Sequence, residues 1–254
     1  MNNDPWNLIK LGRYDEAIRQ FEREFEASRA RRRLSLSDFA NKATGEMAAG
    51  RMLDAERTLE QSLVFSEQQA RGSDLRLLLS EVQWLSGHAE EAVGSLMSRI
   101  QGLKDRSMQY ADSAGGGTEG LILYYYGARL DRTSLIDNAN QWLKRVRKQN
   151  RFGLRNWPGA LVRWFLGELD DLAVLIEGCR TSSLEAAVSK ATTDKLARRH
   201  LIEICFNRAV RALRQGEQSQ SLELFETVVS LENPLTSTEW YLAQHEVNRL
   251  RFSS

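Results

Sequence analysis

The feature that most constrains the fold is a recurring trio: a glycine, a small residue five positions later, and a large apolar residue four positions after that. Four segments carry the full pattern: Gly12-Ala17-Phe21, Gly50-Ala55-Leu59, Gly87-Ala92-Leu96 and Gly216-Ser221-Phe225. A fifth copy, Ala139-Leu143, keeps the small and large residues but has Ser134 in the glycine position. The first three glycines, at 12, 50 and 87, are spaced as in helix–turn–helix repeats.

Each residue type in the trio suits a helical hairpin. A glycine adopts the left-handed backbone conformation that ends one helix and lets the next fold back. The small residue lets the two helices approach closely, and the large residue fills the gap to the neighbouring hairpin. Only 3 of the 254 residues are proline, which breaks helix interiors. The sequence therefore predicts an all-α chain.

The clearest copy of the trio is LGRYDEAIRQF at residues 11–21, which resembles the tetratricopeptide repeat (TPR) family. The resemblance extends over most of the chain and implies a TPR-like solenoid of five to six helical hairpins. It implies little about function, beyond protein binding on the concave face formed by the first helix of each pair. Mapping the repeat phase onto that face selects six candidate partner-binding residues: Thr44, Met47, Glu81, Trp84, Phe206 and Val210. Trp84 is either an interface anchor or a packing residue of the adjacent hairpin.

The helical periodicity also predicts element boundaries. A short helix begins after Asp4, with Pro5 in its first position. Further helices are expected at 13–29, 36–49, 53–70, 74–85, 89–103, 118–130, 134–148, 160–166, 169–177, 194–215 and 218–231, with a capping helix at 237–250. The glycine-rich stretch 113–118 is expected to be a flexible surface loop between an N-terminal stack, 1–112, and a C-terminal stack, 119–254.

The C-terminal region supports a second resemblance. Residues 157–250 contain Trp-Pro, LVRWFLGELDD, ICFNRAVRALRQGEQSQSLELFETVV and EWYLAQHEVNRL, in that order. This order is similar to the C-terminal half of the bacterial NlpI-type repeat lipoproteins, which are non-enzymatic adaptors for envelope hydrolases and proteases. From residues 1–6, MNNDPW, we expect neither a secretory signal nor an N-terminal lipid-acceptor cysteine, and therefore a bacterial, cytoplasmic adaptor without a membrane partner.

Residues that would support catalysis or cofactor binding are sparse. Gly115 and Gly120 have phosphate-loop spacing, but Leu121 and Ile122 stand where lysine and serine or threonine are needed. The three histidines, His88, His200 and His245, fall on separate elements, and Cys179 and Cys205 are far apart. We therefore expect no enzymatic activity, no cofactor and no metal, and two reduced, apolar cysteines.

Charge is balanced overall, at +1, but one segment is basic. Seven cations occur between residues 141 and 163 without an acidic residue: Lys144, Arg145, Arg147, Lys148, Arg151, Arg155 and Arg163. Trp142, Phe152, Trp157 and Trp164 are interleaved with them. The segment has three interpretations: a solvated outer face with aromatics filling repeat interfaces, a docking surface for an acidic protein, or a nucleic-acid surface.

These observations predict a non-enzymatic, cytoplasmic TPR adaptor whose partner is another protein. One alternative is a bacterial immunity protein that binds and neutralises a toxin, since a small single-module chain suits a dedicated inhibitor. A second alternative is nucleic-acid association through the basic 144–163 segment, which predicts an affinity that falls steeply with salt.

Overall fold

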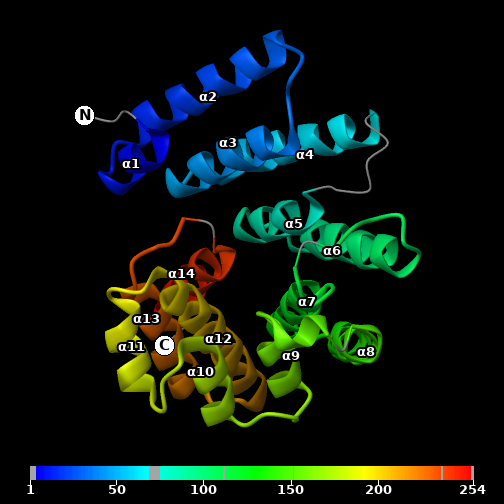
Figure 1. Ribbon diagram of the computed structural model, residues 1–254, viewed down its shortest axis with the longest axis vertical. Helices are drawn as coiled ribbons and strands as arrows, with labels where there is room; N and C mark the ends of the chain where they lie inside the picture. The colour runs from blue at the N-terminus through cyan, green and yellow to red at the C-terminus, as the bar shows by residue number, and fades with distance from the viewer. Residues whose placement is uncertain (1–3, 69–74, 111, 151, 236, 253–254) are drawn as a thin grey trace. The chain divides into compact units, whose positions relative to one another are not determined.

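The computed structural model describes residues 4–68, 75–110, 112–150, 152–235 and 237–252. Within these ranges the chain forms α-helices and one 3₁₀ turn, without a β-strand (Figure 1). The all-α prediction is therefore confirmed. The chain divides into two compact units, residues 1–109 and 110–254.

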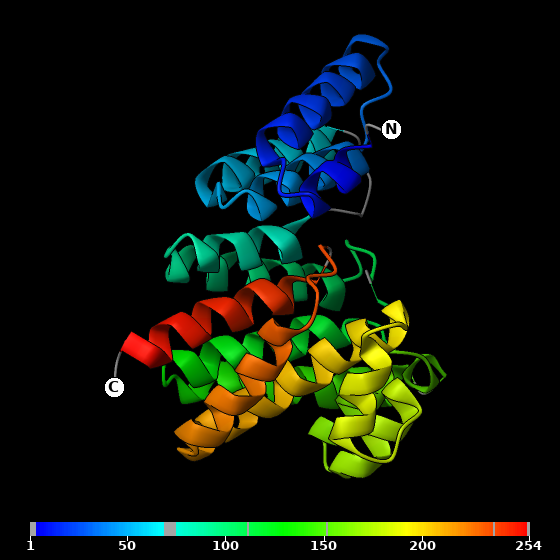
Figure 2. The same ribbon diagram turned by 90° about the vertical axis from the view of Figure 1, so that its left-hand side faces the viewer.

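Unit 1, residues 1–109, is a series of helices in which each packs against the next along the chain (Figures 1 and 2). Its elements are α1 (Pro5–Lys10), α2 (Tyr14–Ala30), α3 (Leu36–Ala48), α4 (Met52–Gln68), α5 (Arg76–Leu85) and α6 (Ala89–Lys104). Asp4 is the N-cap of α1, although its side chain makes no capping hydrogen bond. Part of the predicted 53–70 and 74–85 helices lies outside the described residues.

Unit 2, residues 110–254, is arranged around one long helix, α12. Its elements are α7 (Gly117–Arg129), α8 (Thr133–Gln149), the 3₁₀ turn η1 (Gly153–Arg155), α9 (Gly159–Phe165), α10 (Asp171–Cys179), α11 (Leu184–Ala191), α12 (Lys195–Gln215), α13 (Gln218–Ser230) and α14 (Thr238–Phe252). Helix α12 contacts α7, α10, α11, α13 and α14. Figure 2 shows α12, α13 and α14, the last three helices of the chain, side by side. A helix in a linear stack has fewer neighbours, so α12 is buried more completely than the repeat pattern predicts. Helix α11 has no counterpart among the predicted helices.

The glycine turns have the predicted geometry. Gly12, Gly50, Gly87 and Gly216 have φ between +72° and +87°. In each turn the next residue donates its backbone N–H to the carbonyl five residues earlier, as from Arg13 to Leu8 at 2.9 Å. This is the Schellman arrangement, which satisfies the last carbonyls of a helix. The small residues that follow each glycine, Ala17, Ala55, Ala92 and Ser221, are completely buried.

The fifth copy of the trio turns at a different residue. Ser134 lies inside α8, and the left-handed residue is Asp131, with φ of +50°. Arg132 N–H donates to the Gly127 carbonyl at 2.9 Å, as in the glycine turns. The register predicted from Ser134 is therefore wrong by three residues, because Asp131 takes the turn conformation without a glycine.

The glycine-rich stretch 113–118 is largely buried, and of the expected surface loop only Ser113 is exposed. Residues 114–117 are buried, and α7 already begins at Gly117. The Asp112 carboxylate accepts hydrogen bonds from Gly116 N–H at 2.9 Å and Thr118 N–H at 2.8 Å. The Trp142 indole donates to the Gly116 carbonyl at 2.7 Å. Small residues are needed here because side chains approach this backbone closely.

Candidate functional site

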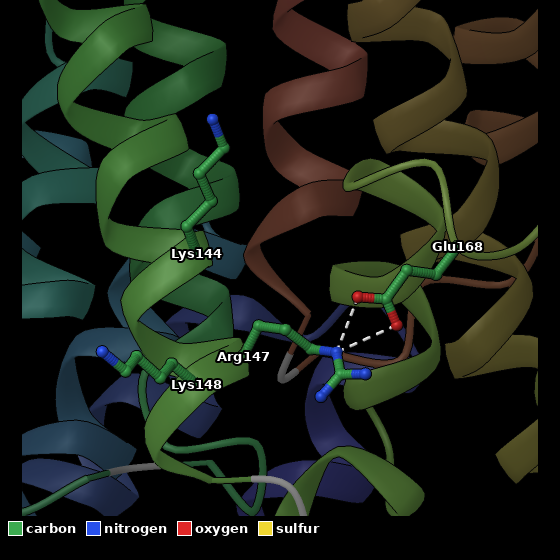
Figure 3. A pocket seen from close by; sticks show the side chains of 4 residues that line it. All are labelled: Lys144, Arg147, Lys148 and Glu168. Carbon is green, nitrogen blue, oxygen red and sulfur yellow. Dashed lines mark hydrogen bonds and ion pairs between the residues drawn. The ribbon is translucent and has the colours of Figure 1, made fainter.

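The candidate site is a surface hollow of about 460 Å³ lined by Lys144, Arg147, Lys148 and Glu168 (Figure 3). The three cations come from α8, where spacings of three and four residues place side chains on neighbouring turns. Lys144 and Lys148 are exposed and make no hydrogen bond or ion pair with any described residue. Both ammonium groups are therefore available to an external anion.

Glu168, which follows α9, holds Arg147. The Arg147 Nε donates to both carboxylate oxygens, at 2.6 and 2.9 Å, as Figure 3 shows. The hydrogen bond and charge of Glu168 raise the pKa of Arg147. Its two terminal nitrogens bond to no described residue, so they keep donors for a second anion. The pair orients the guanidinium, although its contribution to stability is small because both groups are partly exposed.

The remaining cations of the predicted basic patch lie apart from the hollow. Arg163 forms a two-pronged ion pair with Glu177, with both distances at 3.0 Å. Arg145 donates to Gln149 at 3.2 Å, and Arg155 lies 5.6 Å from the Phe152 ring centroid. Arg151 lies outside the described residues. Among the described residues of the patch, only Lys144, Arg147 and Lys148 line the hollow.

The aromatic residues of the segment divide into two groups. Trp142 and Trp164 are 2% exposed and belong to the core, as the packing interpretation predicts. Phe152 is 80% exposed and belongs to the surface. Trp157 is held in place because its indole donates to Glu203 at 2.7 Å and its ring stacks on His200 at 4.1 Å.

All six residues predicted for the concave face are buried: Thr44, Met47, Glu81, Trp84, Phe206 and Val210. Phe206 lies 5.2 Å from the Tyr125 ring centroid and 5.7 Å from that of Phe225, inside unit 2. Phe206 and Val210 are therefore enclosed within unit 2, because α12 contacts five other helices. For all six residues, a role in partner binding stays a prediction.

A buried ionic network in unit 2 was missed by the sequence analysis. Glu246 of α14 is completely buried and accepts hydrogen bonds from the Tyr125 hydroxyl at 2.8 Å and Arg129 Nε at 2.6 Å. Arg249 approaches the other carboxylate oxygen at 3.0 Å. Arg129 and Arg249 neutralise the charge of Glu246, and the bonds from Tyr125 and Arg129 tie α14 to α7. Its one sequence signal is a glutamate inside the apolar stripe of a helix.

The histidines and cysteines make ordinary structural contacts. His88 Nδ1 bonds to Glu56 at 2.9 Å, and His200 Nδ1 to the Gly178 carbonyl at 2.7 Å. Burial raises the pKa of Cys179 to about 11 and that of Cys205 to about 12, so both thiols stay protonated at neutral pH. Within the part of the chain that the structure describes, no three His, Cys, Asp or Glu side chains are grouped for a metal ion.

Comparison with known proteins adds no family assignment: no family model matches the chain, and no curated protein matches it significantly. Across the described ranges, none of the helices combines the length and the apolarity that a membrane span requires. Function is therefore inferred from the geometry of the chain's own residues.

Proposed function

We propose that this protein is a non-enzymatic, TPR-like adaptor of the bacterial cytoplasm that docks an acidic segment of a partner protein on α8. The observation that carries the proposal is the hollow at Lys144, Arg147 and Lys148. Its lining includes two unpaired ammonium groups, which extend away from the Arg147 guanidinium in Figure 3, and that guanidinium is held in place by Glu168.

Recurring contacts within the hairpins support the TPR-like assignment. The Thr58 hydroxyl donates to Glu46 at 2.8 Å, and the Ser95 hydroxyl donates to Gln83 at 2.8 Å. In both hairpins the acceptor stands four residues before the turn glycine and the donor eight residues after it. Repeated hairpins with the same register are typical of solenoids.

The capping role proposed for α14 rests on its packing. The helix contacts α12 and α13, and its inward stripe includes Leu242, Ala243, Val247 and Leu250. Solenoids require such a helix because the last repeat otherwise exposes its apolar face.

The charges around the hollow favour an acidic protein over nucleic acid. A nucleic-acid surface repeats its cations along a phosphate backbone. Here Glu168 and Glu177 pair with Arg147 and Arg163, and the cations that line the hollow are limited to Lys144, Arg147 and Lys148 of one helix rather than spread along a track. Such an area suits a short run of aspartate or glutamate, which it would attract over long distances and release at high salt.

The test is capture of partners from an extract of the native host, followed by comparison of variants. The double variant Lys144→Ala/Lys148→Ala removes two unpaired charges from the hollow. The control Lys10→Ala/Lys195→Ala removes two charges from exposed positions elsewhere. We expect wild type and control to capture the same proteins at low salt, and the double variant to lose them.

Each other outcome has a defined meaning. Equal capture by both double variants contradicts docking on α8. Retention of nucleic acid alone supports the nucleic-acid alternative. Capture of a single toxin-like enzyme, inhibited in the complex, supports the immunity-protein alternative.

A further inference from the structure

A second charged cluster lies on α12 and shares no residue with the α8 hollow. Arg208, Arg211 and Arg214 follow one another at three-residue intervals in the run RAVRALR. The outer two are neutralised, because Arg208 pairs with Asp171 at 2.8 Å and Arg214 with Asp131 at 2.9 Å. Arg211 has no carboxylate partner among the described residues.

Arg211 instead lies on two aromatic rings. Its guanidinium carbon is 4.3 Å from the centroid of the Trp164 ring and 5.7 Å from that of Phe165. The Trp164 indole is buried and donates to Asp171 at 2.7 Å, so the surface under the guanidinium is fixed. Cation–π stacking of this kind holds an arginine in position while leaving the edge of its plane open.

Most donors of this guanidinium are unused. One terminal nitrogen donates to the Phe165 carbonyl at a long 3.4 Å, and the other N–H groups bond to no described residue. Arg211 is only half-buried. A stacked guanidinium that keeps free N–H groups is preorganised for a planar anion, because little side-chain entropy is lost on binding.

Tyr124 of α7 packs against the same Phe165 ring and carries a hydroxyl that can act as a second donor. Its ring meets Phe165 edge-on, with the centroids 4.5 Å apart, and its hydroxyl bonds to no described residue. Burial raises the pKa of Tyr124, against an opposing effect from the charges of Arg211 and Arg214. The phenol is therefore neutral at physiological pH and keeps its proton for donation.

We propose that Arg211 and Tyr124, supported by Trp164 and Phe165, form a recognition site for the carboxylate of an acidic side chain on a protein partner. A singly charged, planar carboxylate matches the guanidinium fork. Asp171 and Asp131, on the neighbouring arginines, disfavour a doubly charged phosphate. The site shares no residue with the α8 hollow and does not depend on it.

The experiment titrates ¹⁵N-labelled protein with an N-acetylated, C-amidated tetraglutamate peptide at constant ionic strength. The reporters are the Trp164 indole N–H and the Arg211 Nε–H resonances. We expect Arg211→Gln to weaken the binding seen at Trp164 about tenfold or more, and Tyr124→Phe to weaken it about threefold, because charged hydrogen bonds are stronger than neutral ones. The control Arg214→Gln removes the same charge one turn away and should leave affinity within about twofold.

Additional variants keep the proposal separable from stability and from the α8 hollow. Arg211→Lys retains the charge but not the planar fork, so it should also weaken binding even if Arg211→Gln folds poorly. Lys144→Ala/Lys148→Ala should leave the response at Trp164 intact, whether or not the α8 surface docks a partner.

Three results would overturn the proposal. The first is equal weakening by Arg211→Gln and Arg214→Gln, which indicates bulk charge. The second is full affinity in both Arg211 variants. The third is an equal affinity for inorganic phosphate, which indicates an unselective anion surface.

Discussion

At Gly45 of α3, helices α2 and α3 of unit 1 are in close contact. A methyl group on Gly45 would stand 2.7 Å from Cδ2 and 2.8 Å from Cε2 of Phe21 in α2. The Phe21 ring is buried, and its other contacts include Trp6, with centroids 5.0 Å apart. The ring therefore has little room to move away, and Gly45→Ala overpacks the α2–α3 contact.

The expected size of the effect follows from two opposing contributions. Alanine in a helix interior stabilises by about 0.5–1 kcal/mol relative to glycine. Overpacking a well-packed core costs about 1–3 kcal/mol. Gly94 of α6 is also inside a helix, but a methyl group there meets nothing within 4 Å. Gly94→Ala is therefore the matched control, which carries the gain without the cost.

The assay is unfolding of both variants and wild type by heat and by urea, followed by circular dichroism. We expect Gly94→Ala to have a higher free energy of unfolding than wild type. The free energy of unfolding of Gly45→Ala should be about 1–3 kcal/mol lower than that of Gly94→Ala. For a chain of this length, each kcal/mol of that difference shifts the melting temperature by about 2–4 °C. If the two variants are equally stable, Phe21 does not pack against Gly45 and the α2–α3 contact is wrong.

Three further predictions concern buried and charged groups. Ala92→Trp should lower the free energy of unfolding by more than about 1 kcal/mol, because Ala92 is completely buried; an unchanged melting temperature would contradict the close packing of its hairpin. Cys179 and Cys205 should resist a thiol reagent at neutral pH until the protein unfolds, so rapid labelling of the native protein would show that they are not buried. The pKa of His88 is raised, first by its hydrogen bond to Glu56, so the stabilisation that it provides is complete below its ordinary pKa of 6.5 and is lost as the pH rises through the raised value. Urea unfolding across that pH range should show that the difference in free energy of unfolding between wild type and Glu56→Gln shrinks as the pH rises. A difference that stays constant would exclude a link between His88 protonation and stability.

The helices were largely predictable because their signals are local. The turn glycines and the apolar spacing fix most boundaries to within one or two residues, as in α6, expected at 89–103 and found at Ala89–Lys104. Helix α11 was missed because its eight residues carry too short an apolar pattern to separate it from a connection. Its one clear signal is Ser183, whose hydroxyl accepts a capping hydrogen bond from Ala186 N–H.

The candidate site was only partly predictable because its charges are set by pairing across the fold. Lys144, Arg147 and Lys148 share a helix face, so sequence spacing places them together. The glutamate that holds Arg147 is 21 residues away in the chain, and no local pattern identifies it. Likewise Phe206 follows the repeat phase of an exposed face, but the extra helices around α12 bury it.

The recurring turn also identifies a position where a substitution can stabilise the protein. At Arg32 the backbone makes the same turn as at the glycines: φ is +54°, and Arg33 N–H donates to the Ser28 carbonyl at 2.9 Å. A side chain in this conformation costs roughly 1 kcal/mol that glycine avoids. Replacing Arg32 with glycine should therefore raise the free energy of unfolding without altering any packed residue. Natural variation or protein engineering can use that gain to offset destabilising substitutions elsewhere in the chain.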